Sequence, residues 1–174
     1  MKRAIARFAA AAVALAACQG LHAQSSPFKS DWEMEQEKLI VREGEVKLPP
    51  RFREENLLEF EIGRTVSFRF FIDRASLDVG TDEVVRYTLV ARSPQGAENL
   101  SYEGIHCKTG RTKAYAFGQA SGGWRAVKQE WVDVEKLWTR VLRTEYFCPK
   151  HRVIRSAAEG VYALQRGGHL ERGN

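Results

Sequence analysis

Apolar and polar side chains alternate through the stretch Thr65-Val66-Ser67-Phe68-Arg69-Phe70-Phe71-Ile72-Asp73. Successive side chains of a β-strand point to opposite faces, so the apolar residues at even positions, from Val66 to Ile72, would form one apolar face. Phe71 interrupts the alternation on the other face, which suggests that this side is covered as well. The stretch therefore predicts a strand within a sheet, with its main apolar face turned toward a core.

Further strands are expected on the C-terminal side of this stretch. Val84–Arg92 repeats the alternation, and the turn signal Ser93-Pro94-Gln95-Gly96 predicts an antiparallel hairpin with a strand from Asn99 to Cys107. A fourth strand is predicted from Thr112 to Gly118. Between the first two strands, Asp73–Leu77 is interpreted as a short turn or helical stub.

Beyond the strands the apolar spacing changes to three and four residues, which predicts a helix that lies on the sheet; its stripe comprises Val134, Leu137, Trp138, Val141 and Leu142. Tyr146-Phe147-Cys148 is predicted to be extended, because it is short and aromatic and Pro149 follows it. The capping-box pattern Ser156-Ala157-Ala158-Glu159 predicts a short C-terminal helix that ends at Gly167-Gly168. Strands followed by helices indicate an α+β fold with an antiparallel β-sheet and a helix packed on it.

The N-terminal residues have the pattern of a secretory signal peptide. Three basic residues between Met1 and Arg7 precede the apolar run Phe8–Ala17. That run is too short to span a bilayer as a stable helix. We therefore expect an exported protein whose mature part lies in the periplasm or the outer envelope.

Two cleavage sites remain open. Cleavage after Ala23 would remove residues 1–23 as a signal peptide and release a free protein. Alternatively, Leu15-Ala16-Ala17-Cys18 has the form of a bacterial lipobox, so that a signal of residues 1–17 would be removed and Cys18 lipidated. We prefer the free, soluble form; a membrane would be a partner only of the lipidated form.

The mature chain is expected to contain one domain. Residues 24–56 show no sustained apolar period and contain Pro49-Pro50, so they are interpreted as an extended arm or linker. Residues 57–170 are predicted to form the single α+β domain. The arm carries a run of acidic residues that we interpret as solvated rather than as a binding site: Asp31, Glu33, Glu35 and Glu37.

The charge of the mature chain argues against nucleic acid as a partner. Residues 1–23 contain three basic residues and no acidic residue, so their removal lowers the formal net charge from +5 to +2. A nucleic-acid-binding domain of this size usually has a larger positive excess.

Two cysteines remain after the signal is removed, Cys107 and Cys148, and an exported protein lies in an oxidising compartment. We predict a disulfide between them. The alternative is a metal site that includes His106 and His151. His106 and Cys107 are neighbours on a strand and would point to opposite faces, so they are poorly placed to bind one ion. No metal and no cofactor is therefore expected.

The chain resembles the cryptic-neisserial-protein-like (CNP-like) family of small exported bacterial proteins from Glu45 onward. The segments that carry the resemblance are Glu45–Pro49, Glu54–Leu58, Arg69–Asp73, Val85–Val90, Ser101–Cys107 and Tyr146–Pro149. The resemblance implies an exported single domain that ends soon after a short helix, and it implies no particular activity. The chain is also similar, through Ile72-Asp73 and Ala75-Ser76-Leu77, to the surface-adhesin protein E type of domain, which favours a binding role.

No arrangement typical of an enzyme stands out in the sequence. No serine lies in a Gly-x-Ser-x-Gly elbow, and there is no Cys-x-x-Cys, phosphate-binding glycine loop or zinc-peptidase helix motif. The three tryptophans Trp124, Trp131 and Trp138 are interpreted as core residues of the sheet and helix. The protein is therefore expected to have no catalytic activity.

The segment Tyr102-Glu103-Gly104, with His106 nearby, is the first candidate for a binding site. Glu103 should share a strand face with Ile105 and Cys107. It would point either into a partly buried site or into water beside a glycine that relieves crowding, and we prefer the exposed position. A non-enzymatic envelope module that binds another envelope or surface component is the leading hypothesis. A small-molecule hydrolase that uses Glu103 and His106 is the alternative, and a structural lipoprotein is the second.

Overall fold

The computed structural model describes residues 28–63 and 66–169. The chain divides into two compact units between Glu37 and Lys38. In the first unit the structure describes helix α1 (Asp31–Lys38), whose eight residues bury no side chain. The acidic run of residues 31–37 therefore lies on a solvated helix rather than in an extended segment. Cys18, Ala23 and the expected cleavage sites lie outside the described residues, as does the last residue of the expected domain.

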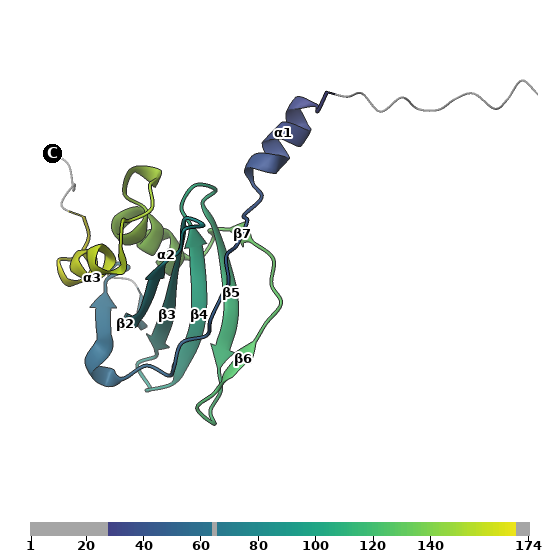
Figure 1. The fold of residues 1–174 in the computed structure, drawn as a ribbon. Helices are drawn as coiled ribbons and strands as arrows, with labels where there is room; N and C mark the ends of the chain where they lie inside the picture. Colours follow the sequence, from purple (N-terminus) through teal and green to yellow (C-terminus); the bar gives the residue numbers. More distant parts are fainter. Residues whose placement is uncertain (1–27, 64–65, 170–174) are drawn as a thin grey trace, which may run out of the picture. The chain divides into compact units, whose positions relative to one another are not determined.

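The second unit contains a seven-stranded antiparallel sheet, in which six strands follow the chain order and β7 pairs with β5 (Figure 1). The strands are β1 (Leu57–Phe60), β2 (Arg69–Val79), β3 (Val84–Arg92), β4 (Glu98–His106), β5 (Arg111–Gly118), β6 (Trp124–Ala126) and β7 (Val132–Asp133). The antiparallel sheet and the hairpin between β3 and β4 confirm the prediction from the alternating stretches.

The turn expected at Asp73–Leu77 is wrong, because β2 runs through it as one strand. The pairing of β2 with β3 shifts register between Asp73 and Asp78, which is a β-bulge. Inside the bulge the Ser76 hydroxyl accepts a hydrogen bond from the backbone N–H of Thr88 at 2.8 Å and donates one to the carbonyl of Asp73 at 2.8 Å. A side chain thus replaces ladder partners, and the chain bends without leaving the sheet.

Helices follow the sheet, as expected, with one correction. The structure has α2 (Leu137–Val141), a π-helix (Leu142–Phe147), a short 3₁₀ turn (Pro149–His151) and α3 (Ala157–Gln165). The prediction of an extended segment at residues 146–148 is wrong for Tyr146 and Phe147, which lie in the π-helix and are buried. Burial of two large aromatic side chains outweighs the weak helix preference of this aromatic sequence.

Helix α3 has the predicted N-terminal cap. The Ser156 hydroxyl accepts a hydrogen bond from the backbone N–H of Glu159 at 3.3 Å. The Glu159 carboxylate accepts from the backbone N–H of Arg155 at 2.9 Å, one residue earlier than a capping box requires. The helix ends before Gly167, which has a φ of 74° that glycine adopts without strain.

The two faces of the sheet are covered by different parts of the chain. The helices pack on one face over the main core, which includes Ile72, Tyr87, Ile105, Leu142, Phe147 and Ile154. The second face is crossed by the segment 38–56, seen as the dark blue trace that passes in front of the strands in Figure 1. Val46 and Phe52 of this segment pack against small apolar clusters of the sheet. This is the cover that Phe71 indicates, and residues 38–56 belong to the compact unit of the sheet.

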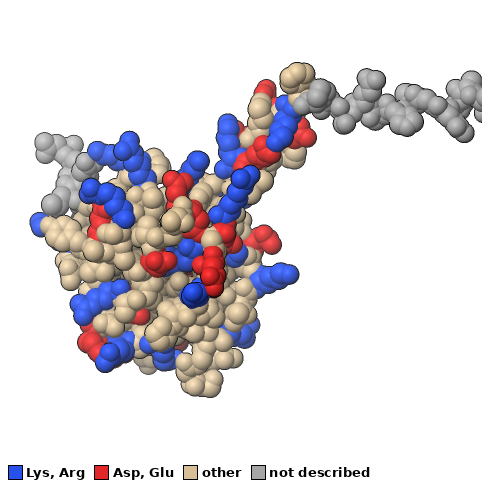
Figure 2. Space-filling view, in the orientation of Figure 1, with Lys and Arg blue, Asp and Glu red and all other residues tan. Residues whose placement is uncertain are grey.

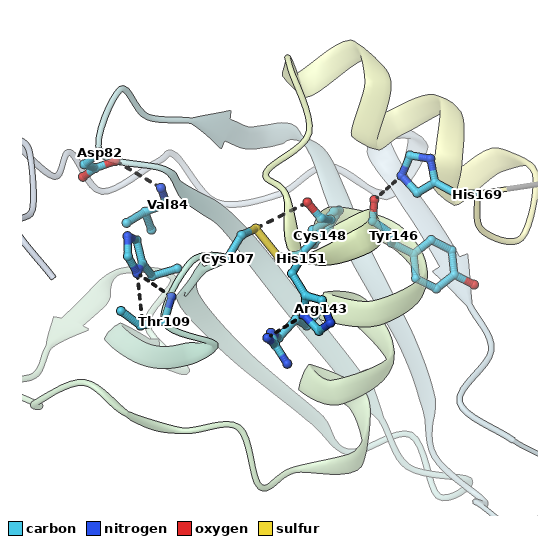
Figure 3. The surroundings of a disulfide bond; sticks show 11 residues. Asp82, Val84, Cys107, Thr109, Arg143, Tyr146, Cys148, His151 and His169 are labelled. Carbon is cyan, nitrogen blue, oxygen red and sulfur yellow. Dashed lines mark hydrogen bonds between the residues drawn. A yellow bond between two sulfur atoms is a disulfide. The ribbon is translucent and has the colours of Figure 1, made fainter. Parts of the chain in front are cut away.

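The predicted disulfide between Cys107 and Cys148 is confirmed, with a Cα–Cα distance of 5.4 Å (Figure 3). It joins the end of β4 to the end of the π-helix inside the main core. His169 lies beside this junction, where its Nε2 is 2.8 Å from the carbonyl oxygen of Tyr146. The bond therefore fixes the helical segment to the sheet at one end.

Candidate functional site

A groove opens on the helix-covered face of the sheet, where the helices leave part of that face free. Its volume is about 570 Å³. The large apolar side chains that line it include Phe68, Phe70, Leu89, Phe117, Leu137 and Trp138. Phe68, Phe117 and Leu137 are 38, 36 and 43% exposed, so the groove presents apolar surface to solvent. Large side chains in such positions mark binding surfaces more often than core.

The walls of the groove follow from the sequence pattern. Phe68 and Phe70 have the even positions of the alternating stretch, and their ring centroids lie 6.3 Å apart. Phe70 in turn stacks on Trp138 at 5.3 Å. Because α2 begins only at Leu137 and is five residues long, no helix of the described residues extends far enough to cover Phe68 and Phe117.

The polar floor of the groove is formed by Ser101 and Glu103 of β4. Glu103 is buried, so the exposed position preferred from the sequence is wrong. The Ser101 hydroxyl donates a hydrogen bond to Glu103 at 2.8 Å, and the Tyr87 hydroxyl donates a second at 3.3 Å. Burial raises the pKa of the Glu103 carboxyl, although the Ser101 bond, the charge of Lys136 and the Tyr87 bond each lower it. The protonated, neutral form is therefore favoured over its ordinary population.

Lys136 lies at the groove, directly before α2. It is exposed, and its ammonium lies over the Trp138 ring, 5.3 Å from the centroid. The indole Nε1 of Trp138 is buried and has no hydrogen-bond partner among the described residues. The groove thus combines apolar walls with an exposed ammonium and with a buried indole N–H that has no acceptor in the part of the chain that the structure describes.

A second, smaller cavity of about 70 Å³ adjoins Glu103 on its other side. Thr139 lines it, and the buried hydroxyl of Thr139 has no hydrogen-bond partner in the part of the chain that the structure describes. A polar space of this size can hold ordered water. Glu103 and Lys136 therefore line both the groove and this smaller cavity.

The residues predicted as a binding site do not come together. Tyr102 points to the opposite face from Glu103, where its ring lies 5.6 Å from that of Tyr115. His106 shares the face of Tyr102 by strand alternation, and its Nδ1 is 2.7 Å from the Thr109 hydroxyl. Burial lowers the pKa of the His106 imidazole, which the nearby carboxylates of Glu83 and Asp82 oppose. Glu103 and His106 therefore cannot act together on one substrate.

The tryptophans predicted as sheet and helix core have three different positions. Trp138 is the one on the helix-covered face. Trp124 lies on the other face, and its Nε1 donates a hydrogen bond to the carbonyl of Pro49 at 2.7 Å. Trp131 makes edge contacts with His106 and Tyr115. The three rings do not form one ligand platform.

The second face has a polar cluster that holds the segment 38–56. The Glu43 carboxylate accepts hydrogen bonds from Lys113 at 2.5 Å and Tyr115 at 2.8 Å. The backbone N–H of Gly44 donates to Asp82 at 2.7 Å, and Asp82 also pairs with the buried Arg86. On the face visible in Figure 2, acidic and basic side chains are interspersed rather than gathered by sign. This cluster uses its charges internally, which indicates a structural role.

Electrostatics in this cluster favour the charged forms. Burial raises the pKa of Asp82, but the hydrogen bonds from Arg86 and Gly44 outweigh burial and lower this pKa to about 2. The pKa of Glu43 is lowered as well, since the bonds from Lys113 and Tyr115 exceed the opposing effect of burial.

The described residues contain no group of three or more histidine, cysteine or acidic side chains that could hold a metal ion. Across residues 28–63 and 66–169, no helix combines the length and apolar character needed to cross a membrane.

An antiparallel sheet with helices on one face, an extended segment on the other and one disulfide defines a small α+β domain. The model of the CNP1-like family matches residues 36–165, so the chain belongs to the CNP1-like family. The match begins just before Lys38 and ends with α3, so it includes the segment that crosses the second face. No curated protein and no solved structure matches the chain significantly.

Proposed function

We propose that this protein is an exported binding module of the cell envelope, and that the groove on the helix-covered face is its binding site. The observation that carries the proposal is the open apolar groove with a buried carboxyl at its floor. Sites of about this volume, with apolar walls and a few polar groups, are typical of small-ligand binding. Export is supported by the basic and apolar pattern of residues 1–17.

Binding at the groove is tested with a neutral, polarity-sensitive dye such as Nile red. Ala91 lines the groove, so Ala91→Trp fills part of it. Ala97 lies on the exposed turn after β3, and Ala97→Trp is the matched control. The wild type and Ala97→Trp should bind the dye with similar affinity, and Ala91→Trp should bind it much more weakly. If a folded Ala91→Trp protein binds the dye like the wild type, the groove is not the site.

Export is tested by the intact mass of the protein from its native host. A chain that begins at Gln24 would support the soluble periplasmic form, and a lipidated N-terminal Cys18 would support the anchored form. A mass that retains residues 1–17 would contradict export.

A further inference from the structure

We propose that the ligand of the groove is an anionic single-chain amphiphile, such as a fatty carboxylate, whose head group pairs with Lys136 and whose chain lies against Phe68, Phe117 and Leu137. This inference rests on the proposed function, because it names the chemistry that the same groove recognises.

Three charged residues line the groove: Glu98, Glu103 and Lys136. Glu98 is paired with Arg51 at 3.2 Å and with Arg92 at 3.1 Å. Glu103 is buried and hydrogen-bonded by Ser101 and Tyr87. Lys136 lowers the pKa of Glu103 through its charge, but its ammonium is exposed. Among the described residues that line the groove, Lys136 is therefore the cation open to a ligand, and its sign selects an anion.

The hydrogen-bonding groups of Lys136 and Trp138 also favour an anionic ligand. An ammonium and an indole N–H can donate but cannot accept. The Trp138 indole N–H is buried and has no hydrogen-bond partner among the described residues. Lys136 lies over the same ring. A carboxylate offers two acceptor oxygens and a negative charge, so it matches the exposed ammonium of Lys136 beside this ring.

The rest of the ligand would lie against the apolar walls of the groove. The remaining walls are chiefly aliphatic and aromatic, and they include three side chains at least 36% exposed. Burial of apolar surface stabilises a complex, so a hydrocarbon chain would supply most of the affinity. The charged head would then set the orientation.

The test uses three ligands of equal chain length, dodecanoate, dodecanol and dodecyltrimethylammonium, each below the concentration at which it forms micelles or separates from solution. Each is measured by displacement of Nile red from the wild type, Lys136→Glu and Lys128→Glu, where Lys128 is an exposed lysine that does not line the groove. The wild type and Lys128→Glu should bind dodecanoate about two- to fivefold more tightly than dodecanol, as a solvent-exposed ion pair allows. Lys136→Glu should bind the cation most tightly.

Several outcomes would overturn the inference. Equal affinity for all three ligands would show an apolar groove without head-group recognition, and the proposed function would stand. Tightest binding of the cation by the wild type would assign recognition to Glu103 instead. A dimer in light scattering that Ala91→Trp converts to a monomer would show that a second copy fills the groove. If no ligand displaces the dye and Ala91→Trp changes nothing, the proposed function fails too.

Discussion

Glu103 is a carboxyl residue in the interior of the sheet, only 5% exposed. It lines both the apolar groove and the smaller cavity. A buried carboxylate is costly, so burial raises the pKa of Glu103, while the hydrogen bonds from Ser101 and Tyr87 reduce the cost of the charged form. A residue held in this way at a groove is more typical of a site than of a core.

Glu103→Gln tests the neutral state. Because the pKa of Glu103 is raised in the folded chain, its contribution to stability is complete at acidic pH and is lost as pH rises through that raised pKa. The variant should match the wild type near about pH 4 and be more stable near about pH 8, by about 1.4 kcal/mol per unit of pKa shift. Urea unfolding at both pH values measures this, with exposed Glu135→Gln as control. An equal effect at both pH values would contradict a raised pKa.

In the buried Asp82–Arg86 ion pair, unlike at Glu103, the charged form of the acidic side chain is favoured. Both side chains are at most 6% exposed, and Asp82 also holds Gly44. Asp82→Asn leaves Arg86 buried without its counter-ion, so the free energy of unfolding should fall by about 3–5 kcal/mol. Chemical denaturation measures the loss, and Asp133→Asn, on an 82% exposed side chain, should change stability little. A loss below about 1 kcal/mol would show that the pair is not needed to hold the segment.

The segment 38–56 packs on the sheet as part of the fold, although it contains little regular structure. Phe52 packs with Phe71, Val90 and Leu100, and the guanidinium of Arg92 lies 5.9 Å from its ring centroid. Glu43, Gly44 and Pro49 add hydrogen bonds to the sheet. The segment therefore provides the cover of one whole face.

Phe52→Ala tests this role. Removal of a partly buried aromatic ring should lower the free energy of unfolding by about 2 kcal/mol. Trp32→Ala is the control, since Trp32 is 70% exposed in the first unit and should matter little. Both are measured by urea unfolding. Equal small effects would mean that the segment is dispensable for the sheet.

The alternation of apolar residues predicts the strands well, because burial on one face repeats every two residues. It misses the bulge in β2, since the Ser76 hydroxyl takes over backbone bonding there and the local sequence resembles a turn. It also misses the π-helix, because tertiary burial of Tyr146 and Phe147 decides their conformation.

The candidate site is less predictable than the strands. Glu103 can be selected from its strand position, but the groove that it lines is completed by Leu137 and Trp138, which follow more than thirty residues later. No local signal distinguishes Lys136 from other exposed lysines. Tyr102 and His106 lie near Glu103 in the sequence, which suggests them as its partners. Strand alternation instead places their side chains on the opposite face of the sheet.

One disulfide links the helical part of the protein to the sheet. Cys107 and Cys148 are 41 residues apart, and both are buried in the main core. Replacement of both by alanine should lower the free energy of unfolding by about 4 kcal/mol, because the unfolded chain gains freedom. Urea unfolding of the variant and of the oxidised wild type measures the loss. Unchanged stability would contradict a structural role for the bond.

The match to the CNP1-like family spans the sheet, its two covers and α3. The groove is formed within this matched region, with lining residues from Ile62 to Trp138. The groove therefore lies within the part of the chain that the family model matches.

The most direct test of the groove is an NMR titration of the uniformly labelled protein with dodecanoate, followed at aromatic and methyl resonances. The groove predicts saturable shifts at Phe68, Phe117 and Leu137, and unchanged resonances for Tyr102 and Tyr115 beneath the segment 38–56. Shifts confined to that second face, or no saturable shift at any resonance, would contradict the assignment of the groove as the ligand site.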